Sequence, residues 1–131
     1  MSSPHHLDEP GAPLLFASGA PGLVVTDVDS TLITQEVIEE LAEAAGTREQ
    51  VAAVTARAMN GELDFAESLR ERVATLRGVP HSVFADVLAR ITPTKGAREL
   101  IDAVHAAGGH FGVVSGGFEE VVAPLVASLG I

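Results

Sequence analysis

The sequence predicts an α/β fold: a core of two parallel strands with helices, and a helical block inserted after the first strand. Short apolar, β-branched runs stand at 23–25 and 111–114, and each leads into polar or glycine-rich residues. Such a run is typical of a parallel strand that ends at a ligand-binding edge. Between the two runs, apolar residues recur with the 3.6-residue period of helices. The closing helix, strand and helix indicate a crossover unit of a parallel sheet.

Composition limits the functions that the chain can have. Its 131 residues suffice for one domain with one core, and 47% of them are hydrophobic. The sequence contains no cysteine, which excludes disulfides and thiolate metal sites and fits the cytoplasm. A formal net charge of −10 argues against nucleic-acid binding. No apolar run approaches the ~18 residues that cross a membrane. No Lys or Arg occurs before Arg48, so the N-terminus lacks the basic start that is typical of a secretory signal. We expect a cytoplasmic protein without nucleic-acid or membrane partners.

The N-terminal segment, 1–21, is predicted to be a flexible tail. It holds four of the seven prolines, together with His5 and His6. Two adjacent histidines on a flexible segment form a poor chelate, so a metal site there is disfavoured.

The segment 22–34 is predicted to be the first core strand and a catalytic loop. Its apolar residues, Leu23 to Val25, are continuous rather than alternating. Continuity of this kind is typical of a strand buried on both faces.

The segment 35–92 is predicted to be an inserted helical cap of four helices. The first ends at Gly46, and Thr47 with Gln50 forms a capping-box pattern for the second. Asn60-Gly61 ends that helix, and residues 82–91 form the fourth.

The third helix of the cap is predicted to begin at Asp64 and to end before Gly78 and Pro80. Its inward residues by helical spacing are Phe65, Leu69, Val73 and Leu76.

The segment 93–131 returns to the core. Thr94 is predicted to cap a helix that runs to Ala107, and a strand follows at 111–114. A helix from about Phe118 to Leu129 closes the unit.

Asp27 and Asp29 stand at the end of the first strand, where parallel sheets bind ligands. Alternation places both on one side, with Val28 opposite. Two neighbouring carboxylates repel, and a Mg²⁺ ion, which prefers oxygen ligands, would relieve the repulsion. One carboxylate could then act as nucleophile and the other as general acid. The alternative is a solvated Asp-rich turn, but the apolar strand before the pair favours a functional site.

Ser115-Gly116-Gly117 follows the second strand and opens a helix. A hydroxyl and backbone N–H groups at a helix N-terminus suit an anion. An ordinary turn is the alternative. Beside Asp27 on a neighbouring strand, the segment is interpreted as a phosphate cradle.

Arg72 lies on the apolar face of the third cap helix, and Glu36 lies in the first turn of the first. Arg72 either extends to water or meets an anion, and Glu36 alone could be a surface residue that suits the helix dipole. Together they could grip a zwitterion, with Arg72 on a carboxylate and Glu36 on an ammonium group.

Four segments carry a family resemblance over about residues 22–131: "DVDSTL", "MNGELDFAESLRERV", "ITPTKGA" and "VVSGGF". In this order they resemble the phosphoserine phosphatases of the haloacid-dehalogenase superfamily. The resemblance implies a partial haloacid-dehalogenase-like Rossmannoid core with an inserted helical cap. The implied reaction is hydrolysis of O-phosphoserine to serine and phosphate, the last step of serine biosynthesis, through an aspartyl-phosphate.

The resemblance also implies roles for single residues. Asp27 would be the nucleophile, and Asp29 would protonate the leaving serine oxygen and then activate water. Mg²⁺ would be held by the Asp27 carboxylate and the Asp29 carbonyl. The substrate-binding residues would be Ser115 and Gly116 for the phosphoryl group, Glu36 and Arg72 for the amino-acid end, and Met59 and Phe65 for the cap pocket.

The sequence departs from the family pattern at its end. Members of the family continue past "LGI" and supply a later lysine and a Gly-Asp and Asn-Asp segment; the one lysine here, Lys95, belongs to another motif. We therefore expect a truncated chain that is inactive alone and self-associates through an exposed sheet edge. The alternatives are another capped phosphomonoesterase or phosphotransferase of the superfamily, and a non-catalytic binding or assembly module.

Overall fold

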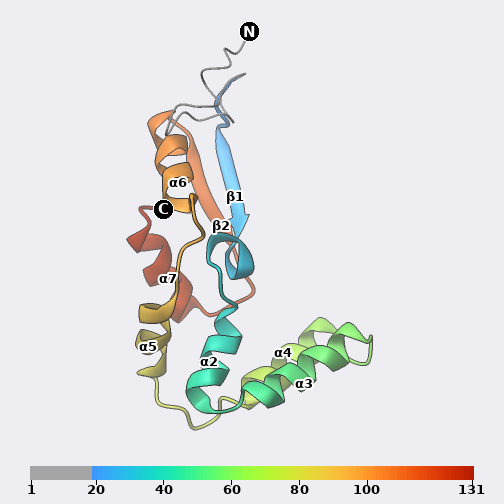
Figure 1. The fold of residues 1–131 in the computed structure, drawn as a ribbon. Coiled ribbons are helices and arrows are strands. Elements are labelled where there is room, and N and C mark those ends of the chain that lie inside the picture. Colours follow the sequence, from blue (N-terminus) through green and yellow to red (C-terminus); the bar gives the residue numbers. More distant parts are fainter. Residues whose placement is uncertain (1–18) are drawn as a thin grey trace.

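A computed structural model describes residues 19–131, so His5, His6 and nearly all of the predicted tail lie outside the described residues. At one end of the molecule lie the two strands with α6 and α7, and at the other lie α2 and α5, with the α3–α4 hairpin projecting sideways (Figure 1). The elements in order are β1 (Leu23–Asp27), η2 (Val28–Leu32), α2 (Val37–Ala45), α3 (Arg48–Met59), α4 (Phe65–Ala74), α5 (Val83–Arg90), α6 (Ala97–Ala106), β2 (His110–Val114) and α7 (Glu119–Ser128). None of the helices in the described part is both long and apolar enough to cross a membrane.

The sheet consists of β1 and β2, paired in parallel with Leu23 opposite His110 and Asp27 opposite Val114. This pairing confirms the predicted α/β fold with two parallel strands. Because parallel strands run in the same direction, the residues that follow Asp27 and Val114 leave the sheet at one edge. Both predicted chemical segments therefore begin at that edge.

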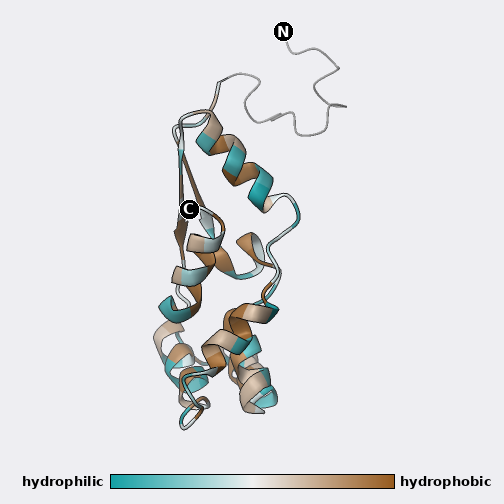
Figure 2. Cartoon of the chain, turned by 90° about the vertical axis from the view of Figure 1, so that its left-hand side faces the viewer, coloured by the Kyte–Doolittle hydropathy of each residue, from teal (hydrophilic) through white to brown (hydrophobic). Residues whose placement is uncertain are grey.

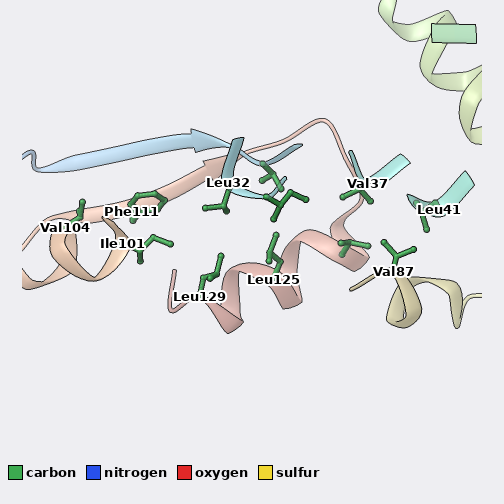
Figure 3. Close-up of a cluster of buried hydrophobic side chains, with 12 residues drawn as sticks. Leu32, Val37, Leu41, Val87, Ile101, Val104, Phe111, Leu125 and Leu129 are labelled. Carbon is green, nitrogen blue, oxygen red and sulfur yellow. The ribbon is translucent and has the colours of Figure 1, made fainter. Parts of the chain in front are cut away.

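The prediction that the first strand is buried on both faces is wrong. The side chains of Leu23 and Val25 are 62% and 53% exposed, whereas Val24 packs against the core. The reason is that α6 and α7 both lie on one face of the sheet (Figure 3). Bands of apolar and polar residues alternate along the helices in Figure 2, as expected for helices with one buried side.

The main hydrophobic core extends from the sheet into the inserted helices. Val37 and Leu41 of α2 and Val87 of α5 belong to the same cluster as the residues beside the sheet (Figure 3). A smaller cluster of Ile38, Ala42 and Val51 links α2 to α3. The members of the main cluster are Val28, Leu32, Ile33, Val37, Leu41, Val87, Ile101, Val104, Phe111, Val121, Leu125 and Leu129. Thus α2 and α5 are anchored in the core, and the α3–α4 hairpin is attached through the smaller cluster.

Two of the predicted helix ends are confirmed. Gly46 ends α2 in the left-handed conformation, with φ 75°, which glycine adopts without strain. The Asp64 side chain accepts a hydrogen bond from Glu67 N at 2.8 Å and starts α4.

Two predicted threonine caps are wrong. Thr47 precedes α3 but forms no cap bond, because its hydroxyl donates to Thr75 Oγ1 at 3.3 Å. The hydroxyl of Thr94 donates to Thr31 O at 2.6 Å, and α6 begins only at Ala97, after Gly96. In both cases the hydroxyl bonds to a residue distant in sequence.

The predicted inward face of α4 is only partly correct. Phe65 and Val73 are 69% and 39% exposed, whereas Leu69 and Leu76 are partly buried. Ser68 is the buried residue of the helix. Because the hairpin packs α4 mainly against α3, only a narrow strip of the helix is covered.

The start of α2 depends on a residue of the loop after β1. Val37 N, the first N–H group of the helix, donates to Asp29 Oδ1 at 3.0 Å. Glu36, which directly precedes the helix, forms no side-chain cap. Asp29 thus satisfies a helix N–H group from outside the helix.

We predict that Asp29→Ala lowers the free energy of unfolding by about 0.5–2 kcal/mol, the usual loss when a capping side chain is removed. Asp29→Asn keeps an oxygen that can accept from Val37 N, so it should lose less. Urea unfolding of the three proteins measures the difference. Equal losses for the two variants would contradict the capping role.

Candidate functional site

A cavity of about 250 Å³ lies at the edge of the sheet where β1 and β2 end. The end of β1 and the loop after it, the start of α2, the helix α4 and the turn after β2 all contribute to its wall. The lining residues are Asp27, Asp29, Glu36, Ile38, Phe65, Leu69, Arg72, Gly116, Gly117 and Phe118. Six predicted site residues thus meet in one cavity, although they come from three separate parts of the sequence.

Asp27 and Asp29 lie on either side of Val28 in the sequence. Asp27 Oδ1 accepts from Val28 N at 2.8 Å, and the Val28 side chain is completely buried in the core. One oxygen of Asp29 is used by Val37 N, as described above. The other faces the turn after β2, because a Cβ placed on Gly117 would lie 3.7 Å from Asp29 Oδ2.

The surroundings of Asp29 raise the pKa of its carboxyl group. Partial burial is the main cause, and the negative charges of Glu36 and Asp27 act in the same direction. The hydrogen bond from Val37 N and the charge of Arg72 oppose the rise in this pKa. Asp29 therefore keeps a proton to a higher pH than an ordinary aspartate, which suits a general acid.

The turn after β2 is shaped to leave room beside Asp29. Ser115 Oγ accepts from Gly117 N at 2.9 Å. A Cβ on Gly117 would lie 3.0 Å from that oxygen, and one on Gly116 would lie 3.5 Å from Phe65 Cζ. Glycines at these positions let a ligand approach the backbone N–H groups closely.

Glu36 and Arg72 both line the cavity but are held separately. Glu36 Oε1 accepts from Ser30 Oγ at 2.7 Å, and Arg72 Nε donates to Ser68 O at 3.4 Å. Across residues 19–131, no ion pair joins the two side chains. Their charged groups can therefore face a ligand that carries both signs of charge.

The site residues predicted from the sequence and the residues that line the cavity differ at several positions. Met59 is 85% exposed at the end of α3 and does not line the cavity. Of the predicted phosphate turn, Gly116 and Gly117 line the cavity and Ser115 does not. Three lining residues were not predicted as site residues, namely Ile38, Leu69 and Phe118. The signal for Leu69 was its place one turn before Arg72 on the same helix; nothing in the sequence marked Ser30 as the partner of Glu36.

The oxygen atoms at the end of β1 match the chemistry of Mg²⁺. This ion is commonly held by one or two carboxylates, with substrate phosphate and water completing its shell. The Asp27 carboxylate and the backbone carbonyl of Asp29 supply oxygen atoms of the kind that this ion prefers. Within residues 19–131, this cavity included, no group of three or more His, Cys, Asp or Glu side chains could hold a metal, so a Mg²⁺ ion here would need water or substrate oxygens as further ligands.

Curated relatives are similar over most of this chain. It is 54% identical over 114 residues to the phosphoserine phosphatase of Streptococcus thermophilus, covering 87% of this chain and 53% of the relative. It is 54% identical over 112 residues to that of Lactococcus lactis, covering 86% and 52%. The chain thus spans about half the length of these relatives.

Solved structures share the arrangement of the chain. A phosphoserine phosphatase described as a phospho-aspartyl intermediate analogue matches with a TM-score of 0.75 at 41% identity, over 86% of this chain and 54% of that one. A substrate-bound phosphoserine phosphatase complex matches with a TM-score of 0.77 at 39% identity, over 87% and 54%. The family model for haloacid dehalogenase-like hydrolases matches residues 24–131. The chain belongs to the family of haloacid dehalogenase-like hydrolases.

Proposed function

We propose that the chain carries the nucleophile and the substrate-recognition residues of a Mg²⁺-dependent phosphoserine phosphatase. The observation that carries the proposal is the single cavity with Asp27 and Asp29 beside the Ser115–Gly117 turn and with Glu36 and Arg72 also in its wall. A phosphate group and an amino-acid group can occupy it together. The names of the relatives support O-phosphoserine as the substrate, and serine and phosphate as the products.

In the first step, an Asp27 carboxylate oxygen attacks phosphorus, and the bond between phosphorus and the serine oxygen breaks. Asp29, whose pKa is raised, gives its proton to that oxygen and releases serine. In the second step, Asp29 takes a proton from water as the water attacks phosphorus. The bond to Asp27 then breaks, which frees phosphate and restores the carboxylate.

The groups around the phosphate supply its binding. The Ser115 hydroxyl and the Gly116 N–H would donate to phosphoryl oxygens. Mg²⁺, held by the Asp27 carboxylate and the Asp29 carbonyl, would offset the negative charge of the phosphate. In the described cavity wall, Arg72 is the one basic side chain, so this positive charge must come from a metal or another part of the protein.

The amino-acid end of the substrate would lie toward the inserted helices. Arg72 would pair with its carboxylate and Glu36 with its ammonium group. Phe65 and Leu69 would cover the carbon atoms between them, and Met59 stays a predicted pocket residue outside the described cavity. The proposed division is 22–34 and 93–131 as core and 35–92 as cap. A cytoplasmic location is proposed from the cysteine-free sequence.

Two other functions have specific support. Another phosphomonoesterase or phosphotransferase of the family would use the same aspartates with a different cap pocket, and the match to a Salmonella enterica hydrolase of the family (TM-score 0.82, 33% identity, 86% of this chain and 39% of that one) agrees with this. A non-catalytic binding or assembly module is favoured by the shortage of positive charge in the cavity. Phosphate release from a panel of phosphomonoesters separates these functions.

We predict that Asp27→Asn abolishes phosphoserine hydrolysis, because an amide is a poor nucleophile toward phosphorus. The host for the assay is the Streptococcus thermophilus relative with its matching segment replaced by residues 23–131. Asp29→Asn in the same host should instead accumulate the phosphoryl-enzyme, detected by acid-quench labelling. A parental rate in the Asp27→Asn hybrid would rule out Asp27 as nucleophile.

We predict that Arg72→Ala in this hybrid lowers kcat/KM for phosphoserine. The expected loss of transition-state stabilisation is about 2–5 kcal/mol, the cost of losing a buried charged hydrogen bond. Turnover of a small aryl phosphate, which has no carboxylate, should fall far less. Arg70→Ala is the matched control, since Arg70 is exposed on the same helix. Equal losses on both substrates would show that Arg72 only holds the hairpin.

We also propose that the 131-residue chain self-associates through the exposed edge of its sheet, beside which apolar side chains of the open face are exposed. The support is the exposure of Leu23, Val25 and Val114, with Val114 65% exposed. Val25→Lys should lower the mass measured by light scattering at high concentration, whereas Val73→Lys on α4 should not. A monomeric mass for the parent chain at every concentration would exclude self-association.

A further inference from the structure

We propose that Gln35 is a positioning residue that fixes the angle between the sheet core and the inserted helices, and with it the place of Glu36. The chain crosses between these parts twice, at 33–36 and at 90–94, and we call the two crossings the hinge. The role of Glu36 rests on the proposed function, whereas the action of Gln35 on the hinge does not.

The two crossings lie side by side in opposite directions. Ile33 and Pro93 form an isolated antiparallel bridge. Thr34 N donates to Thr92 O at 3.1 Å, and Thr94 N donates to Leu32 O at 2.8 Å. These backbone bonds join the crossings on the side of the core. The residues Val37, Leu41 and Val87 also hold α2 and α5 in the main core, so the bonds of the hinge decide how far these helices can tilt on that core.

The Gln35 side chain extends this connection on the side of the helices. Its Oε1 accepts from Thr92 N at 3.0 Å. Its Nε2 donates to Arg90 O at 3.2 Å and to Thr92 Oγ1 at 3.4 Å. One amide therefore holds the second crossing, 55 to 57 residues later in the chain, by both its oxygen and its nitrogen.

The backbone of Gln35 is held by the loop that carries the aspartates. Gln35 O accepts from Ser30 N at 3.1 Å, and Ser30 Oγ donates to Glu36 Oε1 at 2.7 Å. Gln35 thus bonds to the loop after β1 and to the second crossing at once, and Glu36 is the next residue. The place of Glu36 beside Asp29 is therefore tied to the hinge through Gln35 on one side and through Ser30 on the other.

Gln35→Ala removes all three side-chain bonds while the backbone bridge stays. Because the chain has no cysteine, Ala53→Cys on α3 and Asp102→Cys on α6 can carry two spin labels at exposed positions. We expect Gln35→Ala to broaden the distance distribution between the labels and to speed hydrogen exchange at the Thr92 and Ser30 amides at least tenfold.

Thr34→Val is the matched control: Thr34 is exposed, and its hydroxyl makes no hydrogen bond to any described residue. It should match the parent in both measurements.

Gln35→Glu separates the effect of the Gln35 side-chain oxygen from that of its nitrogen. It keeps an oxygen for Thr92 N and loses the donor to Arg90 O, so protection of the Thr92 amide should return while the distribution stays broader than in the parent. If Gln35→Ala does not fold, the distance distribution of Gln35→Glu alone tests the proposal, and a distribution as narrow as that of the parent would contradict it.

Distances and exchange rates in Gln35→Ala equal to those of the parent or of Thr34→Val would overturn the proposal. Neither readout needs substrate or turnover, so failure of the hybrid to hydrolyse phosphoserine would defeat the proposed function and leave the hinge result unchanged.

Discussion

The parallel pairing of β1 with β2 is the constraint on which the rest of the structure depends. Parallel strands cannot be joined by a tight turn, so a long connection must leave one end of the sheet and return to the other. Here that connection contains all the inserted helices and α6. The same pairing brings Asp27 and Val114 side by side, so the loop with the aspartates and the serine-glycine turn share one edge. The cavity follows from strand direction before any side-chain contact is considered.

The electrostatics of that edge oppose the binding of an anion unless positive charge is added. Three carboxylates line the cavity against one guanidinium, within a chain whose formal net charge is −10. Burial also disfavours the charged form of Asp29 and raises its pKa. A divalent cation between the aspartates would reverse the local field, as metal ions do in phosphate sites. The proposed function thus needs positive charge in addition to Arg72, which Mg²⁺ or another part of the protein would supply.

Much of the architecture and most of the cavity could be predicted from local sequence signals. The two strands, the end of α2 at Gly46 and the start of α4 at Asp64 each depend on neighbouring residues, and a single sequence contains that information. Thr47 and Thr94 failed as caps because their hydroxyls bond to residues far along the chain, which no local pattern reveals. The apolar residues Leu23 and Val25 predicted a strand buried on both faces, but both are exposed. Whether a face of the sheet is buried depends on where other segments of the chain pack. The bonds of Ser30 and Gln35 escaped prediction for the same reason.

The α3–α4 hairpin is attached to the remainder more lightly than α2 and α5 are. The main core includes Val37, Leu41 and Val87 but no residue of the hairpin, which meets α2 through the cluster at Val51. Yet the hairpin carries Phe65 and Arg72, while the aspartates and the serine-glycine turn belong to the sheet edge. In the proposed function, the contacts of Phe65 and Arg72 with the substrate would thus depend on the hairpin, whereas bond-breaking would depend on the end of the sheet. A lineage could exchange one hairpin for another and acquire new substrates without rebuilding its reaction centre.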